Sequence, residues 1–173
     1  MDNTDLAMLI LRVVVGGVVA MHGFMKLGWV GKGGSPAGTA GFFENYLGFK
    51  PGMFWAWVAI LAEGVGGTLL ALGLFGPLPA VAVAADMIVV SIAAHVPKGF
   101  WVGNGGWEFP VPLVAGSLAV ALIGNGLYSL DGLLGLSYPD RLVGLWWIVM
   151  GLGVVLALIL HATFRPKAAP KAA

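Results

Sequence analysis

The composition of this chain indicates a membrane protein. Of its 173 residues, 59% are hydrophobic and 10% are charged, whereas a soluble domain carries about 25% charged residues. The formal net charge of +1 provides no basic field for nucleic acid. The sequence contains no cysteine, which excludes disulfides, thiolate metal sites and thiol relay chemistry. The length allows one domain, and lipid rather than water should be its main solvent.

Five stretches are apolar enough to cross a bilayer as helices of about 20 residues. The first is no secretory signal, because Asp2 and Asp5 precede it and Arg12 interrupts it. A tight turn at 76–79 joins the second and third stretches, which should therefore be antiparallel neighbours. We expect an all-α, multi-pass membrane protein. Its spans should cover residues 6–27, 53–75, 78–96, 111–130 and 142–164.

The charged residues outside the spans are divided unevenly between the two ends of this bundle. With five spans the termini lie on opposite sides, and most lysines fall on the side of the C-terminus. That side carries Lys26, Lys32, Lys50, Lys98, Arg165, Lys167 and Lys171. The other side carries Asp2, Asp5, Asp131, Asp140 and Arg141. The positive-inside rule then predicts an inner-membrane protein with its N-terminus outside and a short basic tail in the cytoplasm.

One connection on the lysine-rich side, residues 41–48, is long enough to have structure of its own. Phe42, Phe43, Tyr46 and Leu47 recur in it at helical spacing. This pattern predicts a short amphipathic helix that lies in the headgroup region of the bilayer.

Ionisable side chains inside the spans are the main functional signal, because each is costly in hydrocarbon and usually faces protein. On the first span, Arg12, His22 and Lys26 share one face at about 100° per residue. This face should therefore pack against other helices. Close-packing positions are expected at Gly16, Gly23, Gly66 and Gly67.

Depth along the helices sorts the polar residues into two layers. In the outer layer, Arg12 lies roughly 9 Å and Asp86 roughly 12 Å below the outer helix ends, at about 1.5 Å per residue. We expect these two residues to form a structural ion pair that fixes the helix register. The alternative role of the pair is contact with an anion or a quinone headgroup.

The second layer lies in the cytoplasmic half, with Glu108 near the interface. Glu63 has two interpretations, a hydrogen bond that bridges helices or a functional acid, since nothing structural demands a carboxylate in mid-helix. Lys26 is expected to reach the interface with its ammonium group. His22 and His95 are expected to be hydrogen-bonded core or interface residues. Together these side chains form either a proton or ligand site or a packing network.

No pattern in the sequence indicates a metal or a haem. Metal-ligand spacings of the HExxH or EF-hand kind do not occur. A bis-histidine haem would need His22 and His95 to face one cavity, and their helix phases are not matched, so haem is not expected. His161 lies in the last turn of the fifth span, where the helix dipole favours a cation, and is expected to be structural.

Several short polar and glycine motifs follow one another between residues 6 and 134. They are Leu11-Arg12, the run at 22–27, Ala62-Glu63, Gly66-Gly67, Leu72-Gly73-Leu74, the stretch 95–108 and Tyr128-Ser-Leu-Asp131. In this order they resemble the DoxX family of small membrane proteins. The resemblance implies a four-helix membrane bundle over residues 1–134, related to the DoxD-like subunit of thiosulfate:quinone oxidoreductase and to proteins found with oxidative-stress enzymes. Asp86 and residues 135–173, an added spanning helix with a basic tail, depart from the family pattern.

The preferred hypothesis is a membrane subunit of quinone-linked redox chemistry, in oxidative stress or sulfur oxidation. His22 and Lys26 would donate hydrogen bonds to quinone carbonyls, and Glu63 would exchange the protons that follow the electrons. His95 and Glu108 would complete the ligand contacts with Lys26. A quinone is the cofactor that this site would take, and a partner protein would supply the electron carrier.

Two other function classes stay open. The first is a non-catalytic accessory subunit of a larger membrane electron-transfer complex, which the smooth fifth span favours. The second is a proton or solute pathway, although the sequence lacks the broken helix pairs of a transporter. The expected partners are the lipid bilayer and either a larger membrane complex or further copies in a homo-oligomer, and no nucleic acid.

Overall fold

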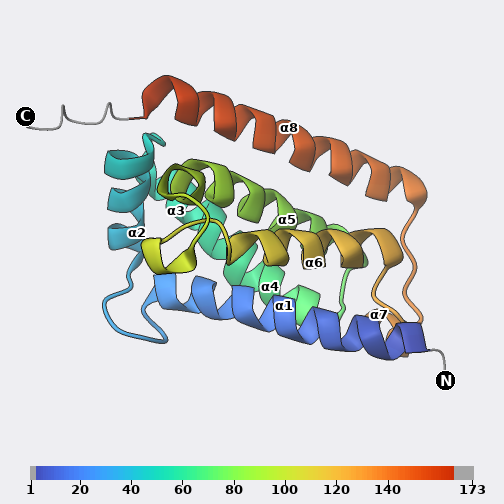
Figure 1. The fold of residues 1–173 in the computed structure, drawn as a ribbon. Coiled ribbons are helices and arrows are strands. Elements are labelled where there is room, and N and C mark those ends of the chain that lie inside the picture. The colour runs from blue at the N-terminus through green and yellow to red at the C-terminus, as the bar shows by residue number, and fades with distance from the viewer. Residues whose placement is uncertain (1–2, 166–173) are drawn as a thin grey trace, which may run out of the picture.

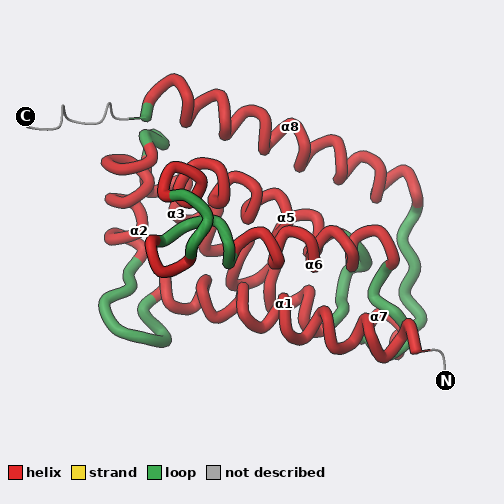
Figure 2. Tube along the Cα trace, viewed as in Figure 1, coloured by secondary structure: helices red, strands yellow, loops and turns green. Residues whose placement is uncertain are grey.

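The computed structural model describes residues 3–165, and their regular structure is entirely helical (Figure 2). Among these residues, four helical segments are long and apolar enough to cross a membrane, at Asn3–Leu27, Gly52–Leu72, Leu78–Lys98 and Asp140–Phe164. These bounds agree with four of the predicted spans to within a few residues. The predicted all-α, multi-pass membrane fold is confirmed, and its apolar helices belong in a lipid bilayer. Asp2 and the basic tail beyond Arg165, with Lys167 and Lys171, lie outside the described residues.

Two of the spans contain π turns, in which hydrogen bonds reach one residue further than in an α-helix. The second span consists of α3 (Gly52–Ile60), the π turn η2 (Leu61–Gly66) and α4 (Gly67–Leu72). The third consists of α5 (Leu78–Val90), the π turn η3 (Ser91–His95) and the 3₁₀ turn η4 (Val96–Lys98). The first and last spans are the single helices α1 (Asn3–Leu27) and α8 (Asp140–Phe164).

The fourth predicted span, residues 111–130, is wrong in length. α6 (Pro110–Ile123) has 14 residues, and its length of about 21 Å is less than a hydrocarbon core of about 30 Å. The helix ends because Gly124 adopts φ 97°, a conformation outside the helical region. A loop then leads to the short helix α7 (Leu130–Leu134), and Asn125 in this loop bonds to the turn between α4 and α5.

α1, the second span, α5 and α6 form a ring, and α8 lies outside it against α5 (Figure 1). α1 contacts η2 and α4, η2 contacts α5, α5 contacts α6, and α6 returns to α1. The side chains of Val19, Val83 and Val120 are each 0% exposed and lie in the apolar core of this ring. The start of α1 and the end of α8 lie at opposite ends of the bundle.

α1 and the second span touch backbone to backbone. A Cβ added at Gly16 would lie 2.5 Å from Ala71 N, and one added at Gly23 would overlap the backbone of Gly64. Gly67 likewise faces Ala20 N at 2.5 Å from an added Cβ. This agrees with the predicted close packing at three of the four glycines. The contact brings the C-terminal half of α1 directly onto η2.

The fourth glycine and the predicted interfacial helix differ from expectation in detail. A Cβ added at Gly66 would make only ordinary contact with a valine side chain, at 3.4 Å. The helix predicted at 41–48 is formed by α2 (Pro36–Phe42) and the π turn η1 (Phe43–Leu47). It begins earlier because Ser35 caps it. α2 runs across the end of the bundle, as a helix in the headgroup region would (Figure 1).

α8 packs along α5 and is otherwise open to its surroundings. Only 6% of its most apolar stretch is buried. His161 is one of its two buried residues, and its Nδ1 lies 2.7 Å from Leu47 O. The ring of His161 also stacks on Phe49 at 5.7 Å, in agreement with its predicted structural role. The division of the chain at residue 134 stays a prediction.

Candidate functional site

Arg12 is fully buried in α1, and its guanidinium group bonds to two backbone carbonyls. Nη1 donates to Ala71 O at 3.1 Å, and Nη2 donates to Tyr128 O at 2.6 Å. Gly73, at φ 66°, leaves the space for this group, since a Cβ there would overlap Nη1. Within residues 3–165 no salt bridge joins Arg12 to Asp86, so the predicted ion pair is not formed.

The position of the turn between α4 and α5 explains this difference. Glu63 and Asp86 lie about equally far along the chain on either side of that turn, so the hairpin places them at one level. α1 instead continues past the turn (Figure 1). Arg12 is therefore level with the end of α4, and Asp86 is level with Glu63.

Asp131, in α7, is the acidic centre of the end where α4 meets α5. Its Oδ1 accepts hydrogen bonds from Phe75 N at 3.0 Å and from the Tyr138 hydroxyl at 2.8 Å. Its Oδ2 accepts hydrogen bonds from Gly76 N at 2.6 Å and from Asn125 Nδ2 at 2.7 Å. One carboxylate thus ties the α4–α5 turn to the segment that follows α6.

These residues form one network, in which Arg12 and Asp131 attract each other electrostatically. Partial burial and the hydrogen bond to Asp131 raise the pKa of Tyr138 above its usual value of 10.0. In the sequence, Asp131 is an outer charge and the end of the motif Tyr128-Ser-Leu-Asp131, and no bonding role is predicted for it, although its place just after the Gly-Asn-Gly turn signals a bonded carboxylate. We call this network the Arg12–Asp131 cluster; it comprises Arg12, Ala71, Phe75, Gly76, Asn125, Tyr128, Asp131 and Tyr138.

Lys26 and Glu63 form a buried ion pair between α1 and η2. The Glu63 side chain is 2% exposed and that of Lys26 is 20% exposed. Lys26 therefore does not simply extend to the interface as predicted, because its Nζ binds an acid inside the bundle. The close contact between Gly23 and Gly64 sets the helix separation that allows this pairing.

Glu63 lies within the π turn η2 of the second span. A π turn adds one residue to a helix and changes the direction of the side chains around it, and such turns often occur at functional sites. The structure thus supplies a second signal, besides the carboxylate itself, at the position that the sequence singled out.

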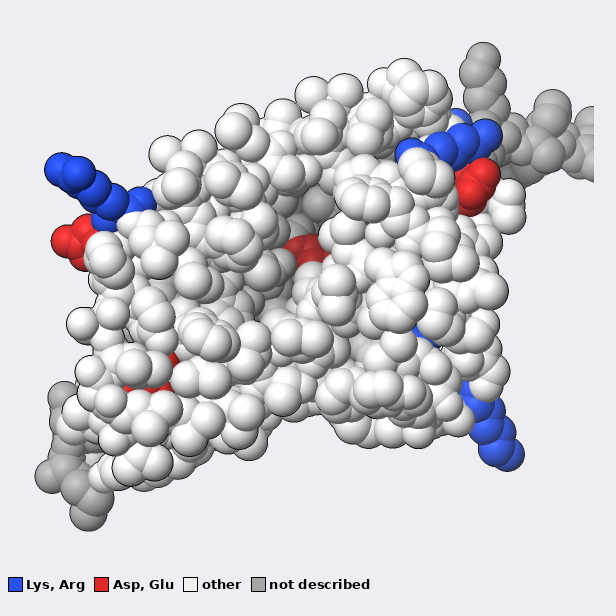
Figure 3. Space-filling model, turned by 180° about the vertical axis from the view of Figure 1, so that it is seen from behind, with Lys and Arg blue, Asp and Glu red and all other residues white. Residues whose placement is uncertain are grey.

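Asp86, on α5, belongs with this ion pair. Its carboxyl group lies at the level of Glu63, on a helix that contacts η2, and within electrostatic reach of Glu63 and Lys26. Its Oδ2 is buried and has no hydrogen-bond partner among the described residues. Seen from behind, the molecule is hollowed near its middle, and acidic atoms lie at the floor of the hollow (Figure 3). We call Lys26, Glu63 and Asp86 the Lys26–Glu63–Asp86 cluster.

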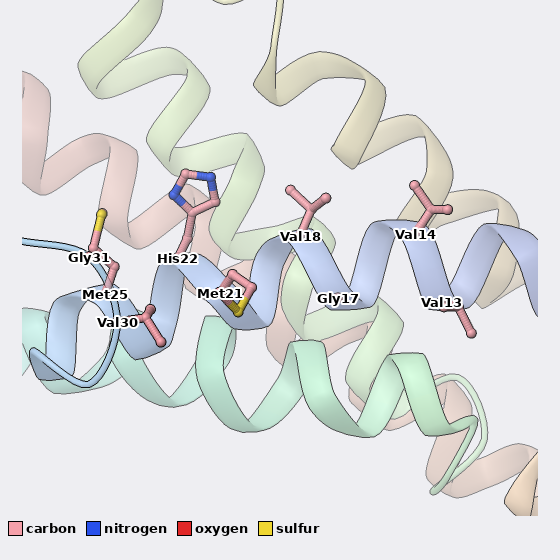
Figure 4. Close-up of a pocket in the computed structure, with 9 residues that line it drawn as sticks. All are labelled: Val13, Val14, Gly17, Val18, Met21, His22, Met25, Val30 and Gly31. Carbon is pink, nitrogen blue, oxygen red and sulfur yellow. The ribbon is translucent and has the colours of Figure 1, made fainter.

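His22 lies next to this cluster on α1 and points toward the start of α6 (Figure 4). Its ring centroid is 5.8 Å from that of Phe109, and it lies within electrostatic reach of Glu63 and Lys26. It also lines a groove of about 670 Å³ on the outer face of α1. The groove is lined by Val13, Val14, Gly17, Val18, Met21, His22, Met25, Val30 and Gly31.

A second, smaller cavity of about 310 Å³ lies at the α2 end of the bundle. Lys26 forms part of its wall, together with Lys32 and the polar residues Ser35 and Thr39. Lys26 therefore touches the buried acid on one side and this cavity on the other.

His95 and Glu108 organise a loop. His95 Nδ1 lies 2.7 Å from Gly105 O, and Glu108 accepts a hydrogen bond from Val102 N at 2.7 Å. Neither side chain bonds to the Lys26–Glu63–Asp86 cluster within the described part of the chain, so their predicted role as ligand contacts stays a prediction. Among residues 3–165 no group of three His, Asp or Glu side chains could hold a metal ion.

Comparison with known proteins identifies the family. The DoxX family model matches residues 7–96, just over half of the chain. No curated protein and no solved structure gives a significant match. The matched region contains the whole Lys26–Glu63–Asp86 cluster and His22, whereas Asp131 and Glu108 lie beyond it. The chain therefore belongs to the DoxX family.

Proposed function

We propose that this chain is the membrane subunit of a quinone-linked redox system, with a quinone headgroup bound at His22 on the outer face of α1. The groove beside His22 is the observation that carries this proposal. A partner protein supplies the electrons, and the polar cluster behind His22 handles the protons that follow them.

The groove has the chemistry of a quinone. Its walls are almost entirely valine, methionine and glycine, and His22 is the ionisable side chain in it. Its volume of about 670 Å³ lies within the range of small-molecule sites. Val13, Val14 and Met21 are 50%, 57% and 53% exposed, so the groove opens toward lipid, from which a quinone arrives. An apolar tail fits these walls, and the imidazole N–H can donate to a carbonyl oxygen.

The second part of the proposal concerns proton transfer. Reduction of a quinone to a quinol takes up two electrons and two protons, so a site needs a proton donor near the headgroup. Glu63 is that donor or acceptor, because it lies within electrostatic reach of His22 and is held by Lys26. Lys26 then keeps the carboxylate stable between turnovers.

Blocking the groove tests the quinone site. A Cβ at Gly17 would meet no atom within 4 Å, so Gly17→Leu fills the groove without a clash in the bundle. Gly153→Leu on α8 is the matched control, because it also has open space around it but lies outside the groove. In lipid nanodiscs, we expect Gly17→Leu to weaken binding of a short-tailed quinone about tenfold, or about 1.4 kcal/mol. Equal affinity in both variants, or none in the wild type, would overturn the proposal.

The alternative, a non-catalytic accessory subunit, rests on α8. Most of this helix is open, and residues such as Leu145, Ile148 and Leu152 are 58%, 61% and 64% exposed. That apolar face suits a neighbouring membrane chain as well as lipid. Native electrophoresis of mildly solubilised membranes separates the two functions. The accessory role is favoured if the chain migrates with a larger complex and Gly17→Leu leaves the quinone-linked activity of that complex unchanged.

We also propose that the α2 end faces the cytoplasm and the N-terminus the outside of an inner membrane. Lys26, Lys32, Lys50 and Lys98 all belong to the end of the bundle that carries α2, as the positive-inside rule requires of a cytoplasmic end. A reporter fused to the C-terminus that is active only outside the membrane would reverse this orientation.

A further inference from the structure

We propose that Glu63 and Asp86 share a single proton inside the membrane and exchange it with water at the α2 end, past Lys26. This proton store needs no quinone, and it gives Asp86 a function that the groove at His22 does not assign.

The geometry places two carboxyl groups and one ammonium group together. Glu63 on η2 and Asp86 on α5 lie equally far from the turn that joins the second and third spans, on elements that contact each other, and within electrostatic reach of each other. Lys26 reaches Glu63 from α1. One oxygen of Asp86 is buried without a partner among the described residues. The pair therefore has an acceptor site to spare and no donor to fill it.

The charge balance calls for one proton. With both acids ionised, the cluster would carry two negative charges and one positive charge inside the bundle, and the neighbouring carboxylates would repel each other. One proton between them removes the excess charge and turns the repulsion into a hydrogen bond. The result is a neutral cluster.

No other charge near the cluster removes the need for this proton. From α1, His22 lies within electrostatic reach, and an ordinary imidazole is mainly neutral at pH 7 and then adds no charge. From η3, His95 is bonded to Gly105 O in the loop. α6 carries no ionisable side chain, and neither does α8 between residues 142 and 160.

Lys26 is the exchange point with water. Glu63 is 2% exposed and Asp86 is half-buried on α5, away from the α2 end, whereas Lys26 is 20% exposed and lines the cavity of about 310 Å³ at the α2 end. When the proton leaves, the O–H bond of the carboxylic acid breaks, its electron pair stays on the oxygen, and the proton passes to water in this cavity. Uptake is the reverse reaction. After release both groups are carboxylates: the Lys26 ammonium group holds Glu63, and the net charge of −1 left on the cluster favours uptake of the next proton.

Infrared spectroscopy of the full chain in nanodiscs, without quinone, tests the store. The wild type should show a protonated-carboxyl C=O band at neutral pH that shifts in D₂O, and this measurement needs no variant. Glu63→Gln and Asp86→Asn should each abolish the band, because the remaining carboxylate pairs with Lys26. Glu108→Gln, the matched change in a loop carboxylate, should keep it. A missing band in the wild type, or a band that survives both amide variants, would overturn the shared proton.

Removing the cation tests the charge argument separately. Lys26→Met leaves two carboxyl groups without a positive charge, so both should take up a proton and the band should grow about twofold. An unchanged band in folded Lys26→Met would show that charge balance does not set the protonation of the pair.

The path to water is tested by the rate of deuterium exchange of the same band. Thr39→Trp fills the cavity at the α2 end and should slow exchange about tenfold, because proton transfer from a buried acid needs water within reach. Ala37→Trp, on the same helix but outside the cavity lining, is the matched control and should not slow it. Equal exchange rates in both variants would exclude this path. These infrared measurements contain no quinone, so their outcome does not depend on whether the groove at His22 binds a quinone.

Discussion

The two buried polar clusters of this bundle use similar side chains but are completed in different ways. In the Arg12–Asp131 cluster, the carboxylate accepts four hydrogen bonds, two of them from backbone N–H groups. In the Lys26–Glu63–Asp86 cluster, the ion pair joins two side chains, and one Asp86 oxygen has no partner among the described residues. The first arrangement is suited to holding helices together. The second leaves room for a proton.

Position along the helices causes this difference. Backbone N–H and C=O groups are free at helix ends and in turns, whereas inside a helix they bond to each other. Asp131 and Arg12 lie level with the α4–α5 turn and use its free backbone groups. Glu63 and Asp86 lie within spans and can find only side chains. A polar side chain at a turn thus readily finds backbone hydrogen-bond partners, whereas one in the middle of a span depends on the side chains of neighbouring helices.

The largest expected effect is the loss of Asp131. Asp131→Ala leaves Arg12 buried without an opposing charge and removes the acceptor of four hydrogen bonds, which should cost about 3–5 kcal/mol. Thermal unfolding in detergent measures this. Asp140→Ala, an exposed acid at the start of α8, is the control and should cost about 0.3–1 kcal/mol. Similar small losses in both variants would mean that the Arg12–Asp131 cluster does not hold the bundle together.

The next largest effect concerns the contact between α1 and η2 beside the Lys26–Glu63–Asp86 cluster. Gly23→Ala would place a methyl group on the backbone of Gly64 and push α1 away from η2, at a cost of about 1–3 kcal/mol. The same change at Gly17, where a Cβ meets nothing within 4 Å, should be neutral or slightly stabilising. Melting temperatures of the two variants make the comparison. If they are equal, the Gly23–Gly64 contact does not set the position of Lys26.

The third prediction compares conservative changes in the two clusters. Glu63→Gln keeps shape and hydrogen-bonding capacity, and should cost about 1–2 kcal/mol because Lys26 loses its ion-pair partner and only Asp86 remains to oppose its charge. Asp131→Asn should cost more, since an amide cannot accept all four hydrogen bonds. Quinone-linked activity should fall in Glu63→Gln and persist in folded Asp131→Asn.

A double-mutant cycle with Lys26→Met completes this prediction. If Lys26 and Glu63 stabilise each other, the double variant should lose less than the sum of the two single variants. If the stability losses of the two single variants add exactly in the double variant and all three keep wild-type activity, the cluster only fills the contact between the helices and has no function.

The sequence predicted the spans well and the polar contacts partly, for one physical reason. Span bounds depend on local hydropathy, which the chain carries residue by residue. The end of α6 was missed because Gly124 breaks a stretch that is still apolar. Depth counting correctly put Lys26 and Glu63 in one layer, but it paired Arg12 with Asp86, because it could not show that α1 runs past the α4–α5 turn. Counting outward from that turn would have paired Glu63 with Asp86.

The smallest expected effect is at Tyr138, on the edge of the Arg12–Asp131 cluster. Its neutral hydroxyl donates to Asp131, and partial burial together with this bond raises its pKa in the folded state above 10.0. A raised pKa means that the stabilisation is fully present below pH 10.0 and is lost as the pH rises through the folded value. Tyr138→Phe should therefore lower the free energy of unfolding by about 0.5–1 kcal/mol at neutral pH and by nothing at strongly alkaline pH. Phenolate absorbance during a pH titration should lose its latest phase in Tyr138→Phe but not in Tyr46→Phe, whose ring lies in η1 at the other end of the bundle. If the late phase remains in Tyr138→Phe, it does not come from the Tyr138 hydroxyl. The hydrogen bond from Tyr138 to Asp131 would then have to be removed from the four that Asp131 is described as accepting.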